Sequence, residues 1–190
     1  MSDRILQRPL PLLGVSLEAV VGNRLGAGVY RRWVRSLCLA GDEHVLDIGT
    51  GAGACARHVA AALPAGRLVC LDIDPRWLAI AQRRLAEFGD RVEFVAADAA
   101  EWSRREAFEV VTAHFVLHDI ESTRRCEVLL RVAESLRPHG RLCLREPVTH
   151  GVTARELQDE LLAAGLKPLR PPSRGRVPLM GETIEGVWTT

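Results

Sequence analysis

The chain has 190 residues, enough for one domain that buries about 70% of the surface its unfolded chain exposes. Its 25 basic and 24 acidic residues leave a formal net charge of +1, which argues against a strongly electrostatic nucleic-acid binder. No stretch reaches the ~18 to 20 uninterrupted apolar residues of a membrane span, and no signal-peptide cleavage pattern follows residues 10–21, the nearest candidate. The five cysteines are odd in number and lack metal-ligand spacing, so we expect reduced thiols, no metal site and a cytoplasmic protein.

The first 40 residues predict a small N-terminal helical extension. Residues 1–15 mix prolines and a glycine with leucines, which favours an extended lead-in, and Ser16 is placed to cap a short helix over residues 17–21. A second helix is predicted over residues 28–39, where Val29, Trp33 and Leu37 form one apolar face.

From residue 42 onward, strand and helix patterns alternate, which is typical of an open, doubly wound α/β sheet. The expected strands cover residues 44–48, 67–72, 91–96, 109–114 and 140–145, with two weaker strands at 166–170 and 184–189. The expected helices cover residues 53–63, 75–88, 122–136 and 153–164, with a short turn near 99–104. Residues 41–190 are therefore predicted to form the main part of a single domain.

A glycine-rich turn follows the first strand of this pattern. Gly49, Gly51 and Gly53 alternate with other residues, including Thr50, so the backbone turns sharply and a ligand approaches it closely. The third glycine comes one residue earlier than in a dinucleotide-binding fingerprint. Asp47, two residues before the first glycine, would repel a pyrophosphate and suits a cationic ligand. The next helix directs its N-terminal amides at the turn, where they favour a carboxylate.

This D-x-G-x-G-x-G pattern resembles the first motif of the class I S-adenosylmethionine-dependent methyltransferases, and the resemblance runs from about Asp42 to Pro147. It implies a Rossmann-like, mostly parallel, seven-stranded sheet with helices on both faces. The last two strands would form a hairpin that inserts one antiparallel strand near the sheet edge. The resemblance also implies that Asp47 and the turn from Gly49 to Gly53 bind S-adenosylmethionine. The N-terminal helices would lie over this cofactor and help form the substrate pocket, or they simply cover a sheet edge.

Two further strand ends carry residues that match the family. Asp72 follows the second strand and resembles the acid that accepts hydrogen bonds from the ribose hydroxyls, with Ile73 packing under the adenine. Asp74, directly before Pro75, is better placed to cap the next helix. After the third strand, Asp98 would accept from the exocyclic amine of the adenine and the amide of Ala99 would donate to a ring nitrogen. Asp98 alone is an ordinary turn residue.

The fourth strand leads into two histidines. His114 and His118 are one helical turn apart, so both are predicted to face the pocket, with His114 also beside the cofactor. Either histidine would assist deprotonation of a hydroxyl near pH 7, or act as an ordinary hydrogen-bonding residue. The segment lacks the [D/N/S]-P-P-[Y/F/W] signature of amine methylation on DNA bases and glutamine, which disfavours those substrates. Glu146 would contact an acceptor or be a solvated strand end. An arginine cluster is interpreted as a solvated loop or an anion site: Arg170, Arg174 and Arg176.

These features predict an S-adenosylmethionine-dependent methyltransferase that transfers a methyl group directly, in line, to a small-molecule acceptor. Proximity and alignment are the main requirements for such a transfer, so no obligatory catalytic residue follows from the chemistry. The alternative is a module that binds S-adenosylmethionine or S-adenosylhomocysteine without its own transferase activity and acts with a partner. Nicotinamide-dependent oxidoreduction is disfavoured by the glycine spacing and by Asp47. The sequence specifies neither the identity of the acceptor nor whether the chain forms a homo-oligomer.

Overall fold

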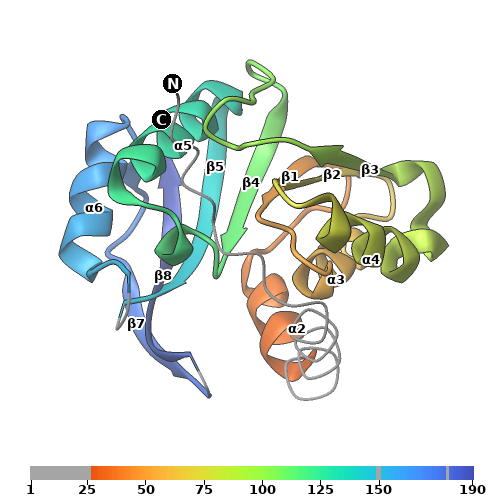
Figure 1. Cartoon of the computed structure of the whole chain (residues 1–190), viewed down its shortest axis with the longest axis horizontal. Helices are drawn as coiled ribbons and strands as arrows, with labels where there is room; N and C mark the ends of the chain where they lie inside the picture. Colours follow the sequence, from red (N-terminus) through yellow and green to blue (C-terminus); the bar gives the residue numbers. More distant parts are fainter. Residues whose placement is uncertain (1–26, 149–150, 179) are drawn as a thin grey trace, which may run out of the picture.

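The computed structural model describes residues 27–148, 151–178 and 180–190. The predicted helix over residues 17–21 lies outside this part of the chain. The described residues form an open eight-stranded sheet with the order β3-β2-β1-β4-β5-β8-β6, and β7 pairs with β8 off this path (Figure 1). All pairs among strands β1 to β5 are parallel, whereas β8 runs antiparallel to β5, β6 and β7. The predicted α/β fold is confirmed.

The helices and strands follow the predicted alternation closely. The α-helices are α2 (Ala27–Ser36), α3 (Ala54–Ala61), α4 (Pro75–Leu85), α5 (Ser122–Ser135) and α6 (Ala154–Ala163), and the 3-10 helices are η1 (Ala86–Arg91) and η2 (Leu117–Asp119). The strands are β1 (His44–Ile48), β2 (Arg67–Asp72), β3 (Val92–Ala96), β4 (Phe108–His114), β5 (Leu136–Pro147), β6 (Lys167–Pro168), β7 (Ser173–Val177) and β8 (Gly181–Thr189).

The C-terminal part departs from the prediction in its strand count. The antiparallel strand near the sheet edge is present as β8, as the resemblance implied. An eighth strand, β7, pairs with β8 in a hairpin, so the expected number of seven is one too few. The polar sequence of β7, Ser-Arg-Gly-Arg-Val, has no apolar alternation because most of its residues face solvent, and such a strand leaves little signal.

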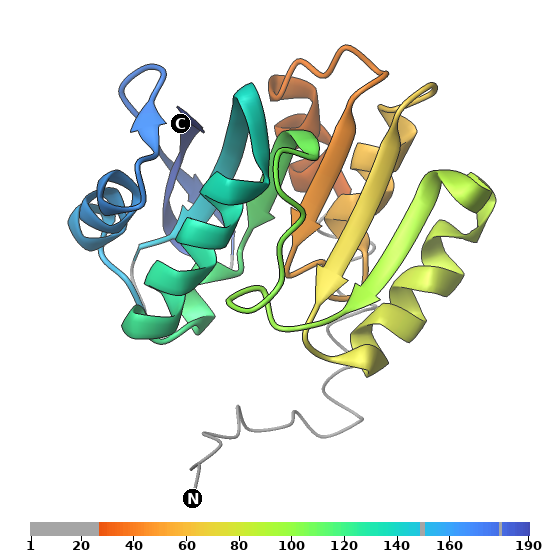
Figure 2. The same ribbon diagram turned by 90° about the horizontal axis from the view of Figure 1, so that it is seen from above.

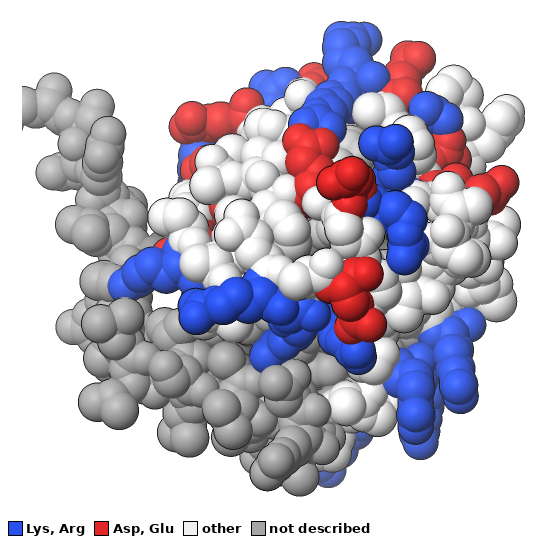
Figure 3. Space-filling model, turned by 90° about the vertical axis from the view of Figure 1, so that its right-hand side faces the viewer, with Lys and Arg blue, Asp and Glu red and all other residues white. Residues whose placement is uncertain are grey.

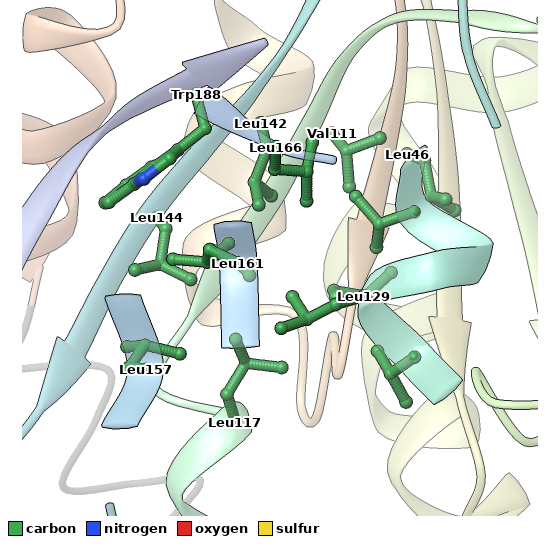
Figure 4. Close-up of a cluster of buried hydrophobic side chains, with 14 of the residues drawn as sticks. Leu46, Val111, Leu117, Leu129, Leu142, Leu144, Leu157, Leu161, Leu166 and Trp188 are labelled. Carbon is green, nitrogen blue, oxygen red and sulfur yellow. The ribbon is translucent and has the colours of Figure 1, made fainter. Parts of the chain in front are cut away.

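Two hydrophobic cores hold the helices on opposite faces of the sheet. Alternate residues of each strand point to opposite faces, so Val45 packs with α2, α3 and α4, whereas Leu46 and Ile48 pack with α5 and α6. Figure 2 shows α2 and α3 behind the strands and α5 in front of them. Figure 4 shows the α5 and α6 side, where leucines of both helices meet Leu142, Leu144 and Trp188 from β5 and β8.

The carboxyl ends of the parallel strands meet at one edge of this sheet. In the register, Ile48 of β1 lies beside Leu71 of β2 and Ala113 of β4, and His114 of β4 lies beside Arg145 of β5. Helix α2 and the β7–β8 hairpin both reach this edge, at the bottom of Figure 1. Ligands of open α/β sheets bind at such an edge, where the strand order reverses, here between β1 and β4. Among the described helices, none is long and apolar enough to cross a membrane.

Candidate functional site

The glycine turn after β1 combines close packing with one open position. A Cβ atom at Gly49 would lie 2.1 Å from Cγ2 of Val116, so only glycine fits there. Gly51 has φ +55°, and a Cβ atom on it would meet nothing nearer than 3.9 Å, so the tip of the turn is open. Gly53 has φ +74° and is the N-cap of α3. The turn therefore leaves space for a ligand at Gly51 and fits tightly against its own protein at Gly49.

Asp47 is buried beneath this turn and is held by two threonines. Its Oδ2 accepts from Oγ1 of Thr50 and its Oδ1 from Oγ1 of Thr112, each at 2.6 Å. Burial raises the pKa of Asp47 to about 6, although both hydroxyls lower it, and the charge of Asp72 raises it further. Sequence reasoning missed Thr112, because the two residues are 65 positions apart. A positively charged ligand group would stabilise the ionised form of this carboxyl.

Asp72 joins the second strand end to the glycine turn. Its Oδ2 accepts from the amide of Gly51 at 2.7 Å and its Oδ1 from the amide of Asp74 at 2.9 Å. Each carboxylate oxygen has a second lone pair, so both can still accept a ligand hydroxyl. Burial raises the pKa of Asp72, and its two main-chain hydrogen bonds offset part of this rise. Asp74 caps α4 as predicted, accepting from the amide of Arg76 at 2.9 Å.

The three residues predicted to meet the adenine lie at the same edge. Ile73 is 53% exposed, which is unusual for an isoleucine and leaves its side chain free to contact a flat ring. Oδ1 of Asp98 accepts from the amide of Ala100 at 2.8 Å, and Oδ2 forms an ion pair with Nη2 of Arg124 at 2.5 Å. Ala99 is half-buried in the same turn. Arg124, on α5, was not foreseen, and its guanidinium occupies one oxygen of the carboxylate that was predicted to bind the adenine amine.

His114 ends β4 inside a cluster of aromatic rings. Its ring centroid lies 4.5 Å from that of Trp33, 5.2 Å from that of Tyr30 and 4.0 Å from that of Phe115. Among the described residues, neither ring nitrogen has a hydrogen-bond partner. Burial, reinforced by the charge of Arg145, lowers the pKa of His114 to about 3. The imidazole is therefore neutral at physiological pH and weakly basic.

His118 has a different environment. Its Nδ1 lies 2.9 Å from Oε2 of Glu146, and its side chain is 15% exposed. Burial lowers the pKa of His118, but the hydrogen bond and charge of Glu146, with the charge of Asp119, outweigh this effect and raise the pKa overall. The expectation that His114 and His118 stand one helical turn apart is wrong, because His114 still belongs to β4 and η2 begins only at Leu117.

Glu146 is not the solvated strand end that was one of its two predicted roles. Its side chain is 0% exposed. Oε1 accepts from the amides of Val116 and Leu117 at 2.7 and 2.9 Å, and Oε2 faces the amide and ring of His118. The arginine cluster is exposed as predicted, with Arg174 and Arg176 on β7 instead of in a loop.

The arrangement fits a nucleoside-bearing cation. Asp47 and Asp72 lie near the carboxyl ends of β1 and β2, and Asp98 follows β3. These strands are neighbours in the sheet, so the three carboxylates line one edge beside the open tip at Gly51. Two of these carboxyls, Asp47 and Asp72, have raised pKa values, and a sulfonium or ammonium group would relieve their mutual repulsion. The surface hollow lined by His44, Arg67 and Phe108 lies at the opposite, amino edge, away from these groups.

Comparisons with known proteins agree with this geometry. The sequence profile of a family described as "Methyltransferase domain" matches residues 45–140. The ubiquinone/menaquinone biosynthesis C-methyltransferase of Syntrophotalea carbinolica is 32% identical over 132 residues, which cover 67% of this chain and 55% of the relative. The chain spans about half the length of the curated relatives it matches.

Solved structures share the fold. The N-methyltransferase NodS from Bradyrhizobium japonicum, in complex with S-adenosyl-L-homocysteine, has a TM-score of 0.72 at 19% identity, over 93% of this chain and 96% of that chain. The mitomycin 7-O-methyltransferase MmcR has a TM-score of 0.76 at 19% identity, over 92% of this chain and 57% of that chain. At such low identity these likenesses bear on the fold alone.

Proposed function

Because the chain belongs to the class I S-adenosylmethionine-dependent methyltransferase family, we propose that it transfers a methyl group from S-adenosylmethionine to a hydroxyl group of a small-molecule acceptor. The resemblance drawn from the glycine turn is thereby confirmed. The observation that carries the proposal is the pair His118 and Glu146, in which a half-buried imidazole is hydrogen-bonded to a fully buried carboxylate. Such a pair is suited to accept a proton from a hydroxyl as its oxygen becomes a nucleophile.

The cofactor would lie across the carboxyl edge of the sheet. Asp72 would accept from the ribose hydroxyls, and Ile73 and Ala99 would meet the adenine. Asp98 would bind the exocyclic amine once Arg124 moves aside or shares the carboxylate. Gly51 leaves the backbone open for the amino-acid end, near the charge of Asp47. When bound, S-adenosylmethionine supplies a methyl group that is already activated on a sulfonium.

The chain's own contribution to the reaction is proton transfer and alignment. The Glu146 carboxylate accepts a hydrogen bond, so Nδ1 of His118 carries the proton in this assignment and Nε2 keeps a lone pair. Nε2 takes the proton of the acceptor hydroxyl, and Glu146 stabilises the resulting imidazolium. Solvent then removes that proton, since the His118 side chain is 15% exposed.

His118 is a better candidate for this role than His114. A base is most effective when its pKa lies near the operating pH. The pKa of His118 is raised from its ordinary value, whereas that of His114 is lowered to about 3. His114 would therefore act as a neutral hydrogen-bonding group towards the cofactor or acceptor. Two nitrogens without partners among the described residues support this role.

Several wider assignments remain proposals. We place the methyltransferase function in residues 41–190, with residues 1–40 as an extension, and the protein in the cytoplasm, where thiols stay reduced. Within the described residues, all five cysteines are free and three are buried.

A neighbour named as an O-methyltransferase and a relative named as a C-methyltransferase are compatible with different acceptor atoms, and the His118–Glu146 pair favours oxygen. A binding module without turnover is the alternative.

The test is an assay with methyl-labelled S-adenosylmethionine and a panel of hydroxylated small molecules, chiefly phenols and hydroxy acids. We expect at least one methyl ether product and a loss of about 10²- to 10⁴-fold in kcat for His118→Gln. The matched control is His44→Gln, at the exposed amino end of β1. S-adenosylhomocysteine binding without any product would favour the binding module, and an active His118→Gln variant would exclude the proposed base.

A further inference from the structure

The proposed base stands on a very short helix. Helix η2 spans only Leu117–Asp119, a single 3-10 turn. One turn of helix does not persist in water without support, because its nucleation is unfavourable. The position of His118 is therefore determined by the groups that contact η2 from the rest of the protein.

The amino end of η2 rests on Glu146. Three successive amides, those of Val116, Leu117 and His118, face its two oxygens at 2.7, 2.9 and 3.4 Å. A carboxylate at the amino end of a helical turn satisfies amides that have no partner within the turn. Glu146 thus orients the ring of His118 and fixes the start of its helix at the same time.

The carboxyl end of η2 rests on Arg125 of α5. Nη1 of Arg125 donates to the carbonyl of Ile120 at 2.7 Å and lies 3.4 Å from the carbonyl of Leu117. Nε and Nη2 pair with the two oxygens of Glu160 on α6, at 2.5 and 2.8 Å. Arg125 is only 3% exposed, so its planar fork connects η2 to two helices in a buried setting.

The sides of η2 leave little room for adjustment. Leu117 is fully buried and points into the core between Leu129 and Leu157 (Figure 4). A Cβ atom at Gly151 would lie 2.1 Å from the carbonyl oxygen of His118. Val116, just before η2, packs directly on Gly49 of the proposed cofactor turn. The helix is therefore enclosed, and a shift of either end displaces the imidazole.

We propose that Arg125 is a positioning residue for His118: together with Glu160 it holds the carboxyl end of η2 and so places Nε2 of the imidazole towards the acceptor. The inference rests on the proposed function, because it assigns a purpose to the position of His118. A purely structural pair between α5 and α6 would use only Glu160. Nη1 of Arg125 instead reaches the carbonyls of Leu117 and Ile120, in and just after η2.

The decisive variant is Arg125→Lys, which keeps the charge but has one nitrogen and cannot bridge Glu160 and the two carbonyls together. Misplacement of a catalytic group by about 1 Å can cost 10²-fold in rate. We therefore expect kcat to fall by about 10-fold or more, the KM for the acceptor to change less than threefold or so, and S-adenosylhomocysteine affinity to stay within about twofold. Glu160→Gln, with its weaker hold on Arg125, should show a smaller fall in kcat.

The matched control is Val132→Ala on the same helix. Val132 is buried, but lies seven residues further along α5, about 10 Å from Arg125 along the helix axis. The Val132→Ala substitution should destabilise the protein without altering kcat. If Arg125→Lys and Glu160→Gln lose stability as Val132→Ala does and leave kcat unchanged, the positioning role is wrong. Should Arg125→Lys fail to fold, Glu160→Gln decides the question by the same comparison.

A readout independent of turnover separates this inference from the proposed function. The pKa of His118 is measured by NMR titration of the imidazole in wild-type, Arg125→Lys and Val132→Ala proteins. Loosening η2 should weaken the hydrogen bond to Glu146 and lower the pKa of His118 in Arg125→Lys alone. An unchanged pKa there, with His118→Gln inactive, overturns only the positioning role. A lowered pKa with fully active His118→Gln overturns only the proposed base.

Discussion

Replacement of Asp47 by asparagine should stabilise the protein in the absence of ligand. The pKa of Asp47 is raised from 3.8 to about 6 by burial beneath the glycine turn. At 1.36 kcal/mol per pKa unit, this shift makes the ionised carboxylate cost about 3 kcal/mol of folding free energy at pH 7. Asparagine has no charge to bury.

The hydrogen bonds around Asp47 reduce this gain only in part. An asparagine amide can donate to one threonine and accept from the other, so one hydroxyl must redirect its proton. Backbone carbonyls are near enough, since Oγ1 of Thr50 lies 3.2 Å from the carbonyl of Asp47 and Oγ1 of Thr112 lies 3.4 Å from that of Leu46. Allowing about 1 kcal/mol for a weaker hydrogen bond, we expect a net stabilisation of about 2 kcal/mol at pH 7.

The pH dependence identifies the cause of this effect. The folded-state pKa is raised, so the folded protein binds more protons than the unfolded chain between about pH 4 and 6. Wild-type stability from this group is therefore lost as pH rises through that window. Denaturant melts of both proteins at pH 4.5, 5.5 and 7 should give a difference in the free energy of unfolding that grows with pH. A difference independent of pH, or a less stable variant at pH 7, would refute the reasoning.

The remaining predictions concern the other site residues. Asp72→Ala should weaken S-adenosylhomocysteine binding by about 10²- to 10⁴-fold, as expected for two lost hydrogen bonds of about 1.5 to 3 kcal/mol each to a charged acceptor. Asp74→Ala should lower stability by about 1 kcal/mol through loss of the α4 cap and leave affinity unchanged; calorimetry and denaturant melts test both, and the reverse pattern would move the ribose to Asp74. The pH profile of kcat should rise through a pKa above 6.5, because neutral His118 is the base and its pKa is raised, and a flat profile would contradict this assignment. The lowered pKa of His114 means that the unfolded chain binds its proton first, so wild-type stability should fall as pH drops below about 6.5, and melts of His114→Gln should lack this component.

The sequence was most informative where a local pattern determines the structure. Strands β1 and β2 have the predicted bounds, because apolar runs end at the glycine turn and at the capped start of α4. Strand β5 begins at Leu136 instead of residue 140, directly after α5, and continues through a turn that was expected to precede it. There, pairing with Phe108 of β4 extends the ladder beyond the apolar segment.

The residues of the candidate site were predictable from the sequence, but the side chains that form hydrogen bonds or ion pairs with them were not. The resemblance supplied Asp47, Asp72 and Asp98 from their positions after successive strands. Their partners come from far along the chain: Thr112 is 65 residues from Asp47, and Arg124 is 26 residues from Asp98. No local pattern encodes such contacts, because the sheet order and helix packing create them.

Exposed basic side chains gather on one face of the molecule. Figure 3 shows them in blue on the lower part of the side that carries α3 and α4. The arginines of α2 and α4 include Arg31, Arg35 and Arg83, all exposed. The buried carboxylates at the sheet edge have the opposite sign, so selectivity for a cationic cofactor is expected to come from the edge and not from the surrounding surface.

The most direct test of the account is a calorimetric titration of the protein with S-adenosylhomocysteine, with NAD as the comparison ligand and Asp72→Ala as the comparison protein. We predict one site per chain with a Kd in the micromolar range for S-adenosylhomocysteine, no measurable binding of NAD, and at least a hundredfold or so weaker binding by the variant. Absence of S-adenosylhomocysteine binding at millimolar ligand, or equal affinity in wild type and Asp72→Ala, would contradict the placement of the cofactor at the carboxyl edge of the sheet.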